Sequence, residues 1–155
     1  MPVIKLQTHI NAPVEDCFDL SRNIDLHLHT MKRKKEEAIA GVTTGLINLH
    51  ETVTWKTTHF GISVIMKVKV TEMETPDFFV VEQVSGPFKW IRHYHGFKVS
   101  NGGTLMVDEF AFCLRLGWLG KLASRIFLKN YMQKQVQQRN QTIKHIAENK
   151  KLKPS

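Results

Sequence analysis

The chain has 155 residues, of which 42% are hydrophobic and 23% are charged, a balance that is typical of globular proteins and excludes wholesale disorder. Its formal charge is +8, from 22 basic and 14 acidic residues. This length corresponds to one domain, and we expect residues 1–150 to form it and residues 151–155 to be a frayed basic tail.

No run of apolar residues is long enough to span a membrane, and the first residues lack the apolar segment of a secretory signal. The two cysteines, Cys17 and Cys113, lie far apart in the sequence and have no CxxC partner. We therefore expect a cytoplasmic protein with reduced cysteines and no stable membrane insertion.

Two clusters carry much of the positive charge, Lys32–Lys35 and Lys150–Lys153. The first is followed directly by two glutamates, and the second lies at the end of the chain. Neither is interleaved with aromatic residues, and no recognition-helix pattern is present. We expect both clusters to be solvated surface and the protein to have no nucleic-acid partner, and the sequence assigns the clusters no other role.

The first 45 residues predict one strand, two short helices and a loop. Residues Val3–Ile10 alternate between apolar and polar, which is typical of a half-buried strand. Pro13 suits the first turn of a helix, and the apolar residues after it have helical spacing. A second short helix is expected over Asn23–Thr30, and Met31–Gly45 is expected to be a polar loop.

The middle of the chain is rich in β-forming residues. Strands are expected over Asn48–Thr57, Phe60–Thr71, Phe78–Ser85, Trp90–Val99 and Gly103–Cys113. An Asn-Gly pair stands between the last two of these segments, and it is the strongest short-range signal of a β-hairpin.

From Trp118 to Asn149 the apolar residues recur with a helical period. A helix of this length rises about 48 Å, which is more than one side of a small core needs. It must therefore lie across the sheet. The element order β-α-α-β-β-β-β-β-α predicts an α+β fold in which a curved antiparallel sheet of about six strands wraps around a long C-terminal helix.

Several short motifs stand in a fixed order along most of the chain. They are Ala12-Pro13 with Phe18, Gly45-Leu46, Trp55 followed by Phe60-Gly61, Gly86-Pro87-Phe88, His93-x-His95-x-Phe97, Gly103-Thr104-x-Met106-x-Asp108 and Gly117-Trp118-Leu119-Gly120. Together they resemble the SRPBCC superfamily, the helix-grip fold that includes START lipid-binding domains, polyketide cyclases and birch-pollen-allergen-like proteins, and above all a subgroup of small bacterial members. Phe112 and Leu116 stand where this subgroup has a tyrosine and a proline. The resemblance implies a cavity between the sheet and the long helix.

The Asn-Gly turn fixes which residues of the last hairpin face each other. With Asn101 and Gly102 as the two turn residues, His95 lies opposite Asp108 on the neighbouring strand. The Cβ atoms of such partners are about 4.5–5.5 Å apart, so we predict a direct hydrogen bond between the two side chains.

Alternation places these residues on the more apolar, concave side of the sheet, and the same alternation predicts that Glu51 points inward. We expect a ligand cavity there. Its expected lining residues are Glu51, Val53, Trp55, Met66, His93, His95, Phe97, Met106, Asp108, Phe110 and Phe112. The remaining histidines, His27 among them, are expected to lie outside the site.

Buried polar groups without partners cost about 1–3 kcal/mol each, so His93, His95 and Asp108 must be satisfied by one another, by water or by a ligand. They have three main interpretations: a structural hydrogen-bond network, polar anchors in a binding cavity, or a catalytic pair in which Asp108 tunes His95 as a general acid or base. A metal site is the weakest interpretation, because no third histidine has ligand spacing. We predict no metal and no cofactor.

These observations predict a protein that binds a small hydrophobic molecule, such as a lipid, a polyketide-like compound or an aromatic metabolite. The alternative is an enzyme of the cyclase or isomerase type, with His95 and Asp108 as catalytic candidates. A third possibility is a membrane-surface or protein-interaction module. The sequence has no P-loop, nucleophile elbow or zinc spacing. It does not name the ligand, establish a reaction, or fix the cavity volume or the oligomeric state.

Overall fold

A single antiparallel sheet of seven strands organises the computed structural model, which describes residues 3–30, 35–59, 61–115 and 125–152. The strand order is β1-β7-β6-β5-β4-β3-β2, so every strand except β1 pairs with its neighbour in sequence. The strands are β1 (Val3–Ile10), β2 (Glu37–Gly41), β3 (Thr52–His59), β4 (Ile62–Glu74), β5 (Phe78–Ser85), β6 (Phe88–Ser100) and β7 (Gly103–Leu114).

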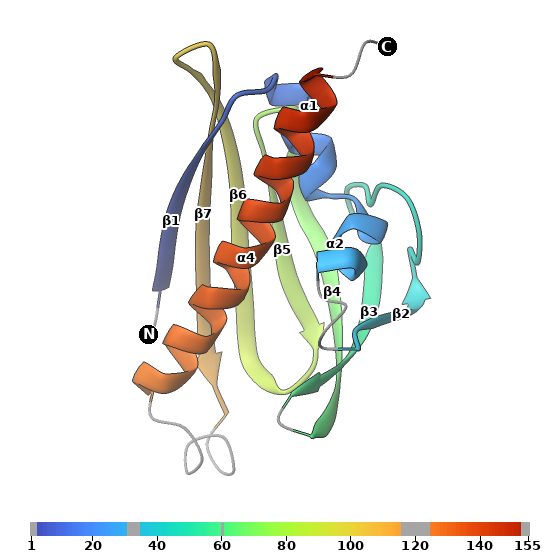
Figure 1. Cartoon of the computed structure of the whole chain (residues 1–155). Helices are drawn as coiled ribbons and strands as arrows, with labels where there is room; N and C mark the ends of the chain where they lie inside the picture. The colour runs from blue at the N-terminus through green and yellow to red at the C-terminus, as the bar shows by residue number, and fades with distance from the viewer. Residues whose placement is uncertain (1–2, 31–34, 60, 116–124, 153–155) are drawn as a thin grey trace.

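Within the described residues, three helices lie on one side of this sheet: α1 (Val14–Ser21), α2 (Ile24–Thr30) and α4 (Arg125–Leu152). Helix α4 runs diagonally across the concave face, and α1 and α2 pack beside it (Figure 1). This is the α+β helix-grip arrangement that the sequence predicts. The first part of the expected helix, with Trp118, and the motif around it lie outside the described residues, as does Leu116.

The sheet has one strand more than expected. Residues Glu37–Gly41 form β2 at the edge of the sheet, within the segment that was expected to be a loop. The strand is short, its pairing with β3 contains a bulge between Ala38 and Ala40, and most of its residues are exposed. Without a buried face it has no apolar alternation, and this is why the sequence pattern does not predict it.

The hairpin of β6 and β7 has the predicted register. Asn101 and Gly102 both have positive φ, 47° and 75°, as a type I′ turn requires, and Ser100 pairs with Gly103. From this turn the pairing runs without interruption to His95 opposite Asp108. The two-residue turn therefore fixes the position of the buried polar residues.

Helix α1 is attached to the sheet by its aromatic and small apolar side chains. Pro13 precedes it in an extended conformation, and Phe18 is fully buried. The Phe18 ring meets the rings of Phe79 and Phe97 edge-on, each at 5.5 Å between centroids. Such edge-to-face contacts add to the stabilisation from burial, so α1 covers one end of the concave face.

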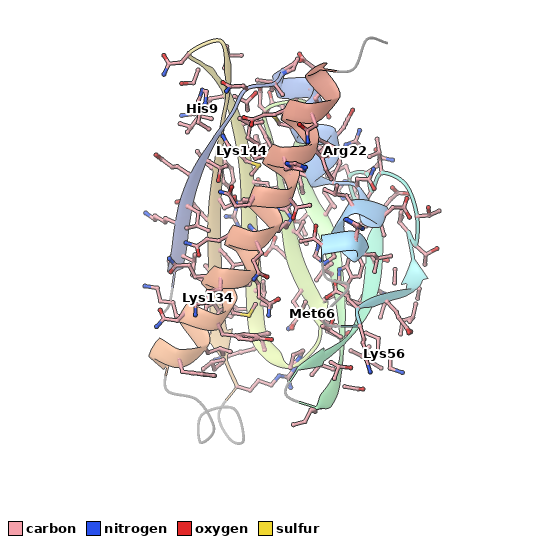
Figure 2. The ribbon with its side chains drawn as sticks, in the orientation of Figure 1. His9, Arg22, Lys56, Met66, Lys134 and Lys144 are labelled. Carbon is pink, nitrogen blue, oxygen red and sulfur yellow. The ribbon has the colours of Figure 1, made fainter. Side chains whose placement is uncertain are left out.

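The C-terminal half of α4 is fixed to the first strand by polar contacts. The backbone N–H of Asn11 donates to Glu148 Oε2 at 2.9 Å, and Lys144 Nζ donates to the carbonyl of His9. Figure 2 shows His9 and Lys144 at this end of the molecule. No helix among the described residues has both the length and the apolar character needed to cross a membrane.

Candidate functional site

A cavity of about 210 Å³ lies between the sheet and helices α2 and α4. Its lining residues include Arg22 and Met66, which Figure 2 labels. Most of its wall is apolar. The apolar lining residues are Ile24, Ile47, Val53, Trp55, Met66, Val68, Val70, Phe79, Val81, Ile91, Phe110, Met132 and Val136.

One part of the wall carries a network of buried polar residues around Asp108, which is fully buried. His93 Nε2 lies 2.9 Å from Asp108 Oδ1, and His95 Nδ1 lies 3.3 Å from the same oxygen. Asn140 Nδ2 donates to the other oxygen at 2.6 Å. Arg139 Nη1 lies 3.8 Å from Oδ1. We call these five residues the Asp108 network.

The predicted contact between His95 and Asp108 is therefore present as a 3.3 Å approach, but His93 makes the shorter contact. His93 and His95 stand two residues apart on β6, and their rings stack at 3.7 Å between centroids. This stacking brings a nitrogen of each ring to one carboxylate oxygen. Asp108 thus orients both imidazoles.

Arg139 and Asn140 come from helix α4 and join the helix to the sheet. Arg139 donates to the carbonyl of Ser21 at 2.8 Å and to Asn140 Oδ1 at 3.2 Å. Because both side chains are buried, each polar atom needs a partner inside the protein. Asp108 on β7 and the Ser21 carbonyl on α1 supply these partners.

Burial and charge determine the protonation of this network. Burial lowers the pKa of His93, although its hydrogen bond to Asp108 opposes the effect. Burial, together with the adjacent His93, lowers the pKa of His95 well below its ordinary value. Burial alone raises the pKa of Asp108, but hydrogen bonds from both histidines outweigh it and leave that pKa well below its usual range. At neutral pH the network therefore holds two neutral imidazoles, one carboxylate and one guanidinium.

Aromatic contacts with neighbouring strands fix the orientation of both imidazoles. His95 stacks on Phe79 at 4.4 Å with an 18° angle between the rings, and His93 meets Phe110 edge-on at 5.0 Å. Both histidines line the cavity, whereas Asp108 lies behind them.

Among the described residues, His93, His95 and Asp108 could offer ligand atoms to a metal ion, because these atoms lie within 4.8 Å of one another. Imidazole and carboxylate are suitable donors for several transition metals. However, the Arg139 guanidinium is 3.8 Å from one carboxylate oxygen, and Asn140 occupies the other. A divalent cation would have to compete with a fixed positive charge, so the geometry favours the hydrogen-bonded arrangement.

A second polar group lies at the edge of the cavity, where α2 approaches β2 and β3. His27 Nε2 contacts Glu36 Oε1, and Thr57 Oγ1 donates to Glu36 Oε2 at 2.8 Å. The His27 ring lies on Trp55 at 4.4 Å. We call His27, Glu36 and Thr57 the Glu36 cluster. All three line the cavity, so the expectation that His27 lies outside it is wrong.

The structure separates the residues expected to line the cavity into two groups. Those that line it are Val53, Trp55, Met66, His93, His95 and Phe110. Of the others, Asp108 lies behind the histidines, Phe97 packs on α1, and Phe112 packs on Phe88 at 5.8 Å. Met106 is buried and accepts a contact from the Ser21 hydroxyl.

Glu51 does not point inward as expected. It is exposed in the turn before β3, where its carboxylate accepts the backbone N–H of Asn48 at 2.7 Å. The predicted strand begins too early, because the turn residues continue the apparent alternation. The inward face starts at Val53, which is 2% exposed.

The polar residues that α4 contributes to the site were not predicted from the sequence, although a signal for them exists. Arg139 and Asn140 fall on the same helical face as Val136, Ile143 and Ala147, all of which are buried. A charged and an amide residue within an apolar stripe must have partners inside the protein. This pattern places them toward the sheet, but it does not identify Asp108 as the partner.

No protein-family model matches the chain, and no curated protein sequence is significantly similar to it. Solved structures are similar to it. The protein TTHA0849 from Thermus thermophilus superposes with a TM-score of 0.72 and 18% identity, over 93% of this chain and 95% of that one. The ZhuI aromatase/cyclase from Streptomyces sp. R1128 superposes with a TM-score of 0.74 and 10% identity, over 95% of this chain and 93% of that one. Major latex-like protein 151 from Panax ginseng superposes with a TM-score of 0.63 and 15% identity, over 94% of this chain and 97% of that one. These likenesses show that the chain shares the helix-grip fold of these proteins.

Proposed function

We propose that this protein binds a small, mostly hydrophobic molecule in the cavity between the sheet and α4. The observation that carries the proposal is the cavity itself, about 210 Å³ in volume, with a mostly apolar wall and a few polar side chains grouped at defined places. This is the usual composition of a small-molecule site. The fold shared with aromatase/cyclases and a plant latex-like protein supports the same function.

The volume restricts the class of ligand. An engineered protein cavity of about 150 Å³ binds benzene, so a cavity of about 210 Å³ suits a molecule of one or two rings or a short chain. A membrane lipid with two acyl chains is far larger. Within the classes that the sequence suggests, the cavity favours an aromatic or polyketide-like metabolite. In keeping with the two free cysteines, we place this binding in the cytoplasm.

Native mass spectrometry of protein purified from its host tests the proposal, because a bound metabolite would appear as a discrete added mass. Val81→Phe would fill the cavity from β5, and we expect it to abolish that added mass. Val84→Phe is the matched control, because Val84 lies on the same strand, is 54% exposed and does not line the cavity. Loss of the ligand from both variants, or from neither, would contradict a site in this cavity.

A second candidate function is acid–base catalysis on the bound molecule, favoured by the two neutral imidazoles that face the cavity with a carboxylate behind them. A neutral histidine oriented by a carboxylate is suited to accept a proton, as cyclisation or isomerisation requires. If this function holds, the co-purified molecule is the product of a change that His95→Asn and Asp108→Asn both prevent. Recovery of the same molecule from all three proteins would indicate binding alone.

A further inference from the structure

Among the buried side-chain nitrogen and oxygen atoms in the described part of the chain, one has no hydrogen-bond partner, the amide nitrogen Nε2 of Gln135 on α4. Most buried side-chain donors in native proteins are satisfied by protein or by ordered water. An unsatisfied amide in a cavity wall therefore indicates a group that is supplied when the cavity is filled.

The position of Gln135 places this donor in the cavity. Met132, Gln135, Val136 and Arg139 all line it, and their spacing of three and four residues puts them on one face of α4. His93 and His95 line the cavity from the sheet. The unused N–H of Gln135 is thus presented from the helix side, opposite the imidazoles.

The charges around the cavity indicate that its occupant is neutral. Both arginines that line the cavity already have a carboxylate partner: Arg139 lies 3.8 Å from Asp108, and Arg22 contacts Asp19 at 2.9 Å. The Glu36 carboxylate accepts a hydrogen bond from Thr57 and contacts His27. A carboxylate or phosphate entering the cavity would lose its hydration without gaining an unpaired cation among the described residues. A neutral oxygen acceptor loses far less.

We infer that the ligand is a neutral, flat, apolar molecule with a carbonyl or similar oxygen acceptor, and that Gln135 Nε2 donates to that oxygen. The inference rests on the proposed function and makes Gln135 the residue that determines specificity. Trp55, Phe79 and Phe110 supply the aromatic surface for the rest of the ligand. Fatty acids and other carboxylates are rejected because nothing in the described wall pairs with their charge.

Three probes of similar shape test the inference by isothermal titration calorimetry: 2-acetylnaphthalene, its hydrocarbon analogue 2-isopropenylnaphthalene, and 2-naphthoate. We expect the ketone to bind about tenfold more tightly than the hydrocarbon, which is the worth of one hydrogen bond in a desolvated site, and the carboxylate to bind most weakly. In Gln135→Leu the preference for the ketone should be lost, and the hydrocarbon should bind at least as tightly as the ketone. Gln137→Leu, an exposed position on the same helix, should keep the preference.

The stability of the free protein gives an independent readout. Gln135→Leu removes an unsatisfied buried donor, so its melting temperature should be unchanged or higher. Equal binding of ketone and hydrocarbon to the wild type, or a preference that survives in Gln135→Leu, would overturn the role of Gln135 while leaving the proposed function intact. Naphthoate binding as tightly as the ketone would overturn the requirement for neutrality. Binding of no probe, with no co-purifying metabolite, would overturn the proposed function itself.

Discussion

The cavity is bordered by two polar groups that look alike in composition and differ in construction. The Asp108 network and the Glu36 cluster each place a carboxylate against histidine. Asp108 lies on β7, which is paired with a strand on each side, and it has no exposed surface. Its partners include two histidines, an amide and a guanidinium. Glu36 precedes the edge strand β2, and its partner His27 keeps 29% of its side chain exposed.

This difference shows how location determines what a histidine–carboxylate contact contributes. If the Glu36 carboxylate is removed, His27 can turn to water and Thr57 loses one acceptor. If the Asp108 carboxylate is removed, Arg139 is left as a buried charge and two imidazoles lose their acceptor. The histidine–carboxylate contact at Asp108 is therefore needed for stability, whereas the contact at Glu36 can be replaced by water.

The largest expected effect is that of Asp108→Ala. We predict that it lowers the free energy of unfolding by about 3–5 kcal/mol, because it leaves the buried Arg139 without a counter-charge. Urea denaturation at pH 7.5 measures this, and Asp108→Ala/Arg139→Met should recover part of the loss. If the folded fraction of Asp108→Ala is too small to measure, Asp108→Asn gives the milder comparison. A loss no greater than that of Glu36→Ala would contradict the distinction between the two groups.

The second-largest effect should be a loss of stability at low pH, caused by the histidines of the Asp108 network. Burial lowers the pKa of His93 and of His95, so the unfolded chain takes up protons that the native protein does not. The free energy of unfolding is therefore highest above about pH 6.5 and decreases below it, by up to about 2 kcal/mol per histidine at pH 5. Asp108, with its lowered pKa, stays ionised over this range.

Urea unfolding at pH 7.5, 6.0 and 5.0 checks this prediction. His95→Asn removes one of the two titrating groups, so its stability should decline less steeply with falling pH than that of the wild type. Unfolding free energies that stay constant between pH 7.5 and 5.0 would show that these imidazoles become protonated without cost in the native state.

Asn140→Leu should have an intermediate effect. It removes the donor to Asp108 Oδ2 at 2.6 Å and leaves that oxygen buried, which costs about 1–3 kcal/mol. Gln141→Leu is the neighbouring exposed control and should change stability by no more than about 0.5 kcal/mol. Equal thermal unfolding of the two variants would indicate that Asn140 contributes nothing to the network.

The smallest effect should come from the Glu36 cluster. Glu36→Gln keeps an acceptor for the Thr57 hydroxyl and removes only the negative charge beside the partly exposed His27. We therefore expect the free energy of unfolding to fall by about 1 kcal/mol or less. Differential scanning calorimetry of Glu36→Gln and Asp108→Asn under the same conditions compares their melting temperatures. A melting temperature lowered as much by Glu36→Gln as by Asp108→Asn would mean that the two polar groups contribute equally to stability.

The same contrast explains what the sequence could predict. His95 and Asp108 lie on consecutive strands joined by Asn101-Gly102, so their juxtaposition follows from a local turn and the two-residue period of a strand. The Glu36 cluster depends on packing between α2 and a short edge strand that has no sequence period of its own. Arg139 is visible as a polar residue in an apolar stripe, but its partner depends on how α4 crosses the sheet, which no local pattern specifies.

The pairing of β1 with β7 has a consequence for the order of folding. All other strands pair with their neighbours in sequence, whereas β1 must close a loop of most of the chain to place Leu6 beside Asp108. Strands β2 to β7 are therefore expected to pair first, and the Asp108 carboxylate stays hydrated until β1 and α4 pack against it. Ile4→Val, in β1, should then accelerate unfolding and hardly slow refolding in stopped-flow experiments. Slower refolding would place β1 in the folding nucleus instead.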